Sequence, residues 1–121
     1  MAMVLIIEDD ELAANIMRQQ LKEDRHEIVW SQDGLEGLKV AQEKRPDFII
    51  LDYNLPSANG VAVLNKLRND PATASIPVLL VSAMAEKDVT GKLRRQFMGV
   101  TFLQKPLDFK RVRALIAAKK I

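Results

Sequence analysis

The sequence predicts an α/β protein in which helices cover both faces of a doubly wound, five-stranded parallel sheet. Two observations support this prediction. Five short apolar runs, bounded by turn-forming or charged residues, have the composition of strands that are buried on both faces. A stretch of helical length follows each run, and such β-α alternation builds a parallel sheet. No repeat, low-complexity segment or linker interrupts the 121 residues, so we expect one domain, 1–121, without an output domain.

The first half of the chain contains three of the predicted strands, at 3–7, 28–30 and 48–51. A helix over 12–23 joins the first two strands, and a capping box at Asp33 begins a second helix that extends to about Lys44. The apolar stripe expected for the first helix consists of Leu12, Ile16, Met17 and Leu21. The residues available for the inner face of the second helix are Leu35, Leu38, Val40 and Ala41. His26 is expected in a surface turn, and Trp30 is expected to pack on an edge strand.

The second half of the chain begins with a helix that Asn59 caps and that ends near residues 69–71. A buried strand over 76–81 follows, and then a weaker helix over 83–97, which contains a glycine. The fifth strand is predicted at 101–103. Asp108 then caps a final helix that continues through Ile116 or beyond.

Composition excludes several classes of protein. Apolar content of 48% and charged content of 28% are ordinary for a globular protein. The absence of cysteine excludes disulfides and thiolate chemistry, and a single histidine excludes a multi-histidine metal site. No apolar run is long enough to span a membrane and no signal peptide is evident, so we expect a cytoplasmic protein without membrane contact.

Charge is distributed unevenly along the chain. Residues 1–60 contain six Lys/Arg and twelve Asp/Glu, a net charge of −6, whereas residues 61–121 contain twelve and four, a net charge of +8. The basic residues of the second half are scattered through amphipathic helices with few aromatic side chains. This pattern favours a solvated face over a nucleic-acid site.

Polar side chains follow four of the five predicted strands. Glu8 and Asp9 end the first strand, Asp52 ends the third, Ser82 ends the fourth and Lys105 follows the fifth. The carboxyl ends of parallel strands meet at one edge of a sheet, where open α/β sheets place their ligands, so we expect these groups to converge. The ordinary role of acids in the first turn of a helix does not account for the whole set.

The expected constellation suits phosphoryl transfer. Three carboxylates at one point require a cation, and oxygen ligands with open positions for water suit Mg²⁺. One carboxylate oxygen of Asp52 can then attack phosphorus to form an aspartyl phosphate. Lys105 and Ser82 offer the ammonium group and the hydroxyl donor that stabilise a transferring phosphoryl group.

Four motifs carry a resemblance to a known family: VLIIEDD, PDFIILDYNLPSANG, IPVLLVSA and FLQKPLD. Together they resemble the response-regulator receiver domains of two-component signalling, over residues 3–118. The resemblance implies the flavodoxin-like, CheY-like fold with strand order 2-1-3-4-5.

The resemblance implies a phosphoacceptor and a metal site. Asp52 would accept phosphate from a sensor histidine kinase, a phosphotransfer protein or a small phosphodonor. Asp9 would bind Mg²⁺ directly, Glu8 directly or through water, and the backbone carbonyl of Asn54 would be a further ligand. Mn²⁺ is the expected substitute for Mg²⁺. Such a domain catalyses its own phosphorylation and the hydrolysis of its own aspartyl phosphate, and is not a conventional enzyme.

Further residues match positions that the family uses for switching. Ser82 would move onto the phosphate and Lys105 would pair with its oxygens. The bond between Lys105 and Pro106 would be cis, and the small Ala83 would leave the phosphoryl site open. Phe102 occupies the aromatic switch position but has no hydroxyl, so its switching would depend on packing alone.

The resemblance also implies a partner surface. Phosphorylation would change the surface formed by the helix at 83–97, the strand at 101–103 and the final helix, which would bind a downstream protein or a fused output domain. We expect an acidic partner there because the surface is basic. Direct binding of nucleic acid is not expected, because no recognised motif or aromatic interleaving supports it. Its basic residues are Lys87, Lys92, Arg94, Arg95, Lys110, Arg111 and Arg113.

Three alternative functions remain open from the sequence. A phosphatase of the haloacid-dehalogenase type would also use an aspartate nucleophile, but Asn54 stands where such enzymes carry a second Asp. An inactive, receiver-shaped binding module would not need the full set of acids. A nucleic-acid-binding domain would fit the basic half of the chain but has no recognised motif here.

Overall fold

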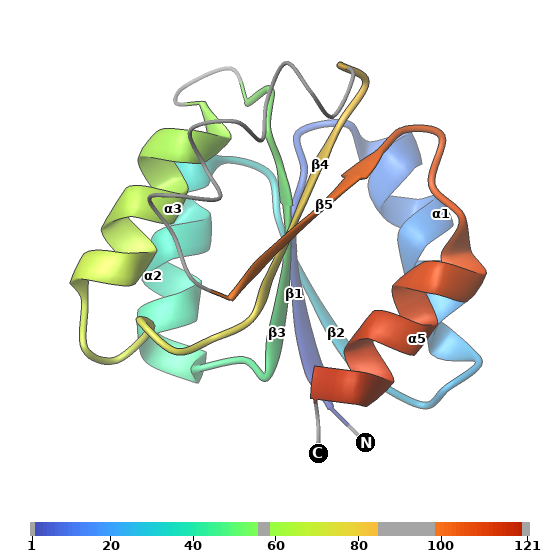
Figure 1. Ribbon diagram of the computed structural model, residues 1–121, viewed down its shortest axis with the longest axis horizontal. Coiled ribbons are helices and arrows are strands. Elements are labelled where there is room, and N and C mark those ends of the chain that lie inside the picture. The colour runs from blue at the N-terminus through green and yellow to red at the C-terminus, as the bar shows by residue number, and fades with distance from the viewer. Residues whose placement is uncertain (1, 56–58, 85–98, 120–121) are drawn as a thin grey trace.

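The computed structural model describes residues 2–55, 59–84 and 99–119, which form a three-layer α/β/α arrangement (Figure 1). All strand pairs are parallel, in the order β2-β1-β3-β4-β5, as predicted. The strands are β1 (Met3–Ile7), β2 (Glu27–Ser31), β3 (Phe48–Asp52), β4 (Val78–Ser82) and β5 (Val100–Gln104). The carboxyl ends of these strands therefore share one edge, at the top of Figure 1.

Two pairs of helices cover the sheet. Helices α1 (Glu11–Lys22) and α5 (Phe109–Lys119) lie on one face, and α2 (Gly34–Lys44) and α3 (Gly60–Asn69) lie on the other (Figure 1). The helix predicted at 83–97 falls almost entirely within residues 85–98, outside the described residues. No helix of the described ranges combines the length and the apolar character that crossing a membrane requires.

Side-chain alternation along the central strands builds two hydrophobic cores. Leu5, Ile49 and Leu80 belong to the core beneath α2 and α3. Val4 and Ile50, on the opposite side of the same strands, belong to the core beneath α1 and α5. Successive side chains of a strand point to opposite faces, so an unbroken apolar run fills both cores at once.

The helix starts follow from capping. The side chains of Asp10, Asp33 and Asn59 each accept a hydrogen bond from a backbone N–H in the first turn of α1, α2 and α3, respectively. The caps predicted at Asp33 and Asn59 are therefore confirmed.

The apolar stripes of α1 and α2 were predicted in part wrongly. Leu12 and Ile16 are 69% and 45% exposed, and Leu35 is 65% exposed. The buried stripe of α1 runs through Ala14, Met17 and Leu21, and the buried residues of α2 are Gly34, Gly37, Leu38 and Ala41. A helical period of 3.6 residues places Leu12 and Ile16 beside each other and outside that stripe, and it likewise turns Leu35 outward.

Candidate functional site

Three carboxylates meet at the carboxyl edge of the sheet. Glu8 and Asp9 directly follow β1, and Asp52 is the last residue of the neighbouring strand β3. One carboxylate oxygen from each lies within 4.8 Å of the other two. Glu8 and Asp52 are only 2% and 5% exposed, and Asp9 is half-buried. The convergence that we expected from topology is present.

Lys105 is the cationic group of this cluster. Its Nζ lies 3.4 Å from Oε1 of Glu8 and 3.6 Å from Oδ2 of Asp52. The Lys105 backbone N–H donates to the carbonyl of Ser82, and the bond to Pro106 is cis. One ammonium group thus lies against two of the three carboxylates, and acidic groups outnumber the basic group in the cluster.

The pKa of Glu8 reflects this buried, acidic environment. Its pKa is raised from 4.5 to about 8, first by burial and then by the neighbouring Asp52 carboxylate, whereas Lys105 acts in the opposite direction. Oε2 of Glu8 is buried and has no hydrogen-bond partner among the described residues. A buried, unpartnered carboxylate oxygen within a three-carboxylate cluster fits a hard divalent cation, because only oxygen donors converge here. The residues present therefore suit Mg²⁺.

The backbone holds Asp52 in place from both sides. The N–H of Asn54 donates to Oδ1 of Asp52 at 3.1 Å, and the N–H of Tyr53 donates to the carbonyl of Val81 at 2.9 Å. Helix α3 begins against this corner, because the N–H of Gly60 donates to the carbonyl of Tyr53 at 2.7 Å.

Gly60 has a role that the sequence analysis missed. A Cβ at this position would lie 2.8 Å from both the carbonyl oxygen of Asp52 and Cα of Tyr53. Only glycine allows α3 to approach strand β3 so closely. Its place at the end of a loop, three residues before the buried Val63, was the available signal.

Trp30 also contributes to the site, although the sequence indicated only an edge-strand packing residue. Its indole Nε1 donates to the backbone carbonyl of Glu8 at 2.7 Å, and the N–H of Glu8 donates to the carbonyl of Ser31 at 3.1 Å. Strand β2 thus fixes the backbone that carries two of the three carboxylates.

Ser82 ends β4 beside Asp52, and its side chain is buried. Its hydroxyl oxygen accepts a hydrogen bond from the backbone N–H of Met84 at 3.0 Å, so the hydroxyl proton remains available to donate. The next residue, Ala83, is exposed. Phe102 is half-buried and packs against the core beneath α2 and α3.

The predicted basic partner surface is only partly described. Lys87, Lys92, Arg94 and Arg95 lie outside the described residues. Lys110 and Arg111 are exposed on α5. The guanidinium of Arg113 instead lies against α1, where it donates to Gln20 and lies 3.8 Å from Oε2 of Glu23.

An apolar groove of about 250 Å³ adjoins the carboxylate cluster between α1 and the loop that leads from β5 into α5. Lys105 belongs to both features. The groove is lined by Ala13, Ile16, Met17, Lys105, Pro106, Leu107 and Phe109.

Comparisons with known proteins agree with this geometry. Residues 4–117 match the family described as the response regulator receiver domain. The polar-differentiation response regulator DivK of Brucella anthropi is 34% identical over 108 residues, which are 89% of this chain and 87% of DivK. The DNA-binding dual master transcriptional regulator RpaA of Synechocystis is 34% identical over 121 residues, which cover 96% of this chain but 49% of RpaA. The chemotaxis protein CheY4 of Vibrio cholerae has the same fold, with a TM-score of 0.87 at 23% identity and 98% coverage of both chains.

Proposed function

The chain belongs to the response regulator receiver domain family, and from that premise we propose that it is a phosphorylation-dependent switch of two-component signalling. Asp52 is the phosphoacceptor, and a histidine kinase or a phosphotransfer protein is the donor. The observation that carries this proposal is the meeting of Glu8, Asp9 and Asp52 within 4.8 Å, with the Lys105 ammonium group 3.6 Å from Asp52.

The chain's own residues account for the transfer. A carboxylate oxygen of Asp52 attacks the phosphorus of a phosphohistidine; the new P–O bond forms as the P–N bond breaks, and the imidazole nitrogen leaves with the electron pair. Lys105 pairs with the phosphoryl oxygens, and the hydroxyl of Ser82 donates a hydrogen bond to one of them. The hydrogen bond from Asn54 N–H to Oδ1 of Asp52 holds the nucleophile in one orientation.

We assign Mg²⁺, with Mn²⁺ as a substitute, to the oxygens of Glu8, Asp9 and Asp52 and to the backbone carbonyl of Asn54. When bound, the ion would neutralise the carboxylates and the negative charge of the phosphoryl group. The buried, unpartnered Oε2 of Glu8 supports this assignment.

The apolar groove beside Lys105 is the proposed docking site of the phosphodonor protein. A phosphohistidine must reach Asp52 from outside, and this groove is continuous with the carboxylate cluster through Lys105. Leu12, exposed on α1 one turn before the lining residue Ile16, extends its apolar surface. Burial of such side chains under a partner helix would stabilise the encounter.

The switch itself is assigned to Ser82, Phe102 and the surface around β5 and α5. A phosphoryl group adds about −1.5 to −2 of charge beside Ser82 and Lys105, which draws their loops inward. Phe102 would respond through packing, and the exposed Lys110 and Arg111 would face an acidic downstream protein or output domain. The cytoplasm, where kinases of this class phosphorylate their partners, is the proposed location.

Intact mass spectrometry after treatment with acetyl phosphate and Mg²⁺ tests the proposal. We expect one added phosphoryl group on the natural chain and none on Asp52→Asn. Asp24→Asn is the matched control, because Asp24 is an exposed turn residue remote from the cluster, and it should be labelled normally. Failure to label the natural chain would support a receiver-shaped binding module, and turnover of a phosphate monoester would support a phosphatase.

The docking assignment is tested separately with Ile16→Glu. This variant should be labelled by acetyl phosphate like the natural chain but more slowly by a phosphorylated histidine kinase that labels the natural chain. Equal slowing with both donors would contradict a role in docking.

A further inference from the structure

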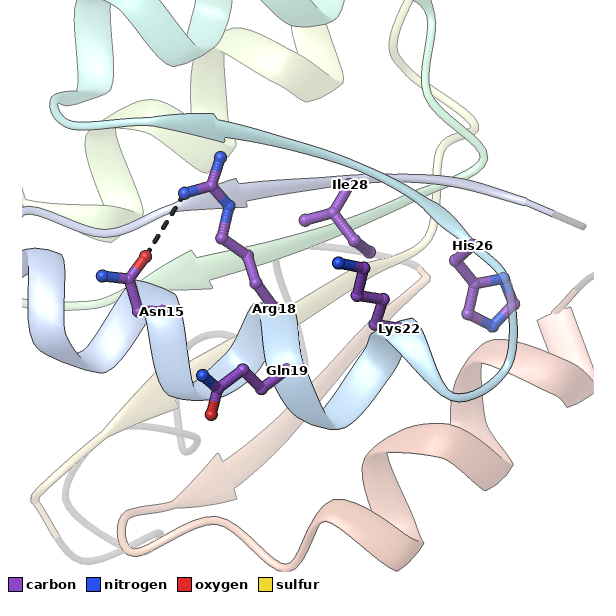
Figure 2. A pocket seen from close by; sticks show the side chains of 6 residues that line it. All are labelled: Asn15, Arg18, Gln19, Lys22, His26 and Ile28. Atoms are coloured by element: carbon purple, nitrogen blue, oxygen red, sulfur yellow. Dashed lines mark hydrogen bonds between the residues drawn. The ribbon is translucent and has the colours of Figure 1, made fainter.

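A second cavity, of about 470 Å³, lies between α1 and β2 (Figure 2). Its lining comes from one face of α1, from the turn before β2 and from β2 itself. The lining residues are Asn15, Arg18, Gln19, Lys22, His26 and Ile28. A volume in this range is ordinary for cavities that bind small molecules.

The charge of this cavity is unexpected for its place in the chain. Residues 1–60 have a net charge of −6, yet two of their six Lys/Arg residues, Arg18 and Lys22, line the same cavity, and no lining residue is acidic. Neither side chain forms an ion pair with any residue that the structure describes. A cavity with two cationic side chains and no acidic one in its lining attracts an anion.

Hydrogen-bonding groups surround the two cations. The guanidinium of Arg18 is oriented by a 3.3 Å hydrogen bond to Oδ1 of Asn15 and lies over the Trp30 ring, 5.5 Å from its centroid. Nδ1 of His26 accepts a hydrogen bond from the N–H of Ala2 at 3.2 Å. The cationic donors of the cavity are thus the guanidinium of Arg18 and the ammonium of Lys22, and Ile28 provides an apolar wall.

We propose that this cavity binds a small phosphorylated molecule, with its phosphate held by Arg18 and Lys22. The guanidinium fork of Arg18 can bind two oxygens and the ammonium of Lys22 a third, which matches the three terminal oxygens of a phosphate monoester better than the two oxygens of a carboxylate. The cavity exceeds the size of a lone phosphate, so an organic body would lie along Ile28.

This site is separate from the phosphoacceptor. His26 precedes β2, at the amino end of the strands, whereas Asp52 lies at the carboxyl end. The proposal does not depend on phosphorylation of Asp52. Trp30 is the only tryptophan of the chain. Its ring lies beneath the Arg18 guanidinium of the cavity and its Nε1 donates to the Glu8 carbonyl of the carboxylate cluster, so its fluorescence reports events in the cavity.

The test is a titration of the full chain with inorganic phosphate and then with a nucleoside monophosphate, without Mg²⁺, followed by Trp30 fluorescence and by amide chemical shifts. We expect saturable changes confined to α1 and β2, and tighter binding of the nucleotide than of inorganic phosphate. Arg18→Gln and Lys22→Gln should each weaken binding about tenfold.

Lys39→Gln is the matched control, because Lys39 is an exposed lysine on α2 in the same acidic half and does not line the cavity. It should bind phosphate within about twofold of the natural chain, since an isolated exposed charge contributes little. An equal loss in Lys39→Gln, or no saturable change with either probe, would overturn the proposal. Tighter binding of a glutamate-rich peptide than of the nucleotide would also overturn it, in favour of an acidic protein segment. Labelling of Arg18→Gln, Lys22→Gln and Lys39→Gln by acetyl phosphate shows, independently of ligand binding, whether Asp52 still accepts a phosphoryl group.

Discussion

Two charged regions of this molecule are built in different ways. The carboxylate cluster at the carboxyl edge takes Glu8, Asp9 and Asp52 from two neighbouring strands and buries two of them almost completely. The cationic cavity takes Arg18 and Lys22 from a single helix and leaves Lys22 exposed. Water screens the second set of charges but not the first.

This difference determines what each region requires. Buried carboxylates that repel one another raise a pKa or bind a cation, and the raised pKa of Glu8 shows the first of these responses. Exposed cations tolerate one another in water, so the cavity gains less from a ligand and should bind it more weakly. The following predictions test this contrast, beginning with the largest effect.

Asp9→Asn should lower the affinity for Mg²⁺ about tenfold or more, because it removes one of three converging carboxylates. The measurement is the shift of the melting temperature as a function of Mg²⁺ concentration. Asp10→Asn is the control. Asp10 is exposed and caps α1 by accepting the N–H of Leu12, a role that Asn also performs. If both variants bound Mg²⁺ equally, the cluster would not be the metal site.

The stability of the metal-free protein should depend on the protonation of Glu8. Its pKa is raised from 4.5 to about 8 on folding, so between these values the folded chain holds a proton that the unfolded chain releases. The free energy of unfolding should therefore fall as pH rises through this window. Melting temperatures across that range, with and without Mg²⁺, measure the effect. Glu8→Gln should flatten the dependence of the free energy of unfolding on pH. An unchanged slope in this variant would show that another group causes the dependence.

The same contrast explains which features of the fold and the site could be predicted from the amino-acid sequence. The carboxylate cluster followed from topology, because apolar runs identify strands and parallel strands bring their carboxyl ends together. The buried faces of the helices were predicted less accurately, because apolar character alone does not show which side of a helix meets the sheet. Leu12 and Ile16, for example, are apolar but exposed. The contact of Trp30 with the Glu8 carbonyl depends on a distance between segments remote in sequence, which no local pattern encodes.

Gly60→Ala should destabilise the fold by about 1–3 kcal/mol, because its Cβ would meet backbone atoms of Asp52 and Tyr53 at 2.8 Å. Urea denaturation measures the change. The comparison variant is Gly37→Ala, whose Cβ would have side-chain atoms of Ile7 as its nearest neighbours, from 2.6 Å. It should be less destabilising because a side chain can move more easily than backbone. The reverse order would show that α3 is free to shift away from β3.

Trp30→Phe should have the smallest effect, and it tests the one residue that contacts both regions. Loss of the 2.7 Å hydrogen bond from Nε1 to the Glu8 carbonyl destabilises the segment after β1, which carries Glu8 and Asp9, by about 0.5–1.5 kcal/mol. The affinity for Mg²⁺ should therefore fall about two- to tenfold. Arg18→Gln keeps that hydrogen bond while it removes the cation above the ring, and it should leave Mg²⁺ affinity unchanged. Calorimetric titration of both variants with Mg²⁺ separates the two contacts. Equal losses would mean that Arg18 holds the indole in its bonding position, and the cationic cavity and the carboxylate cluster would then be coupled through Trp30.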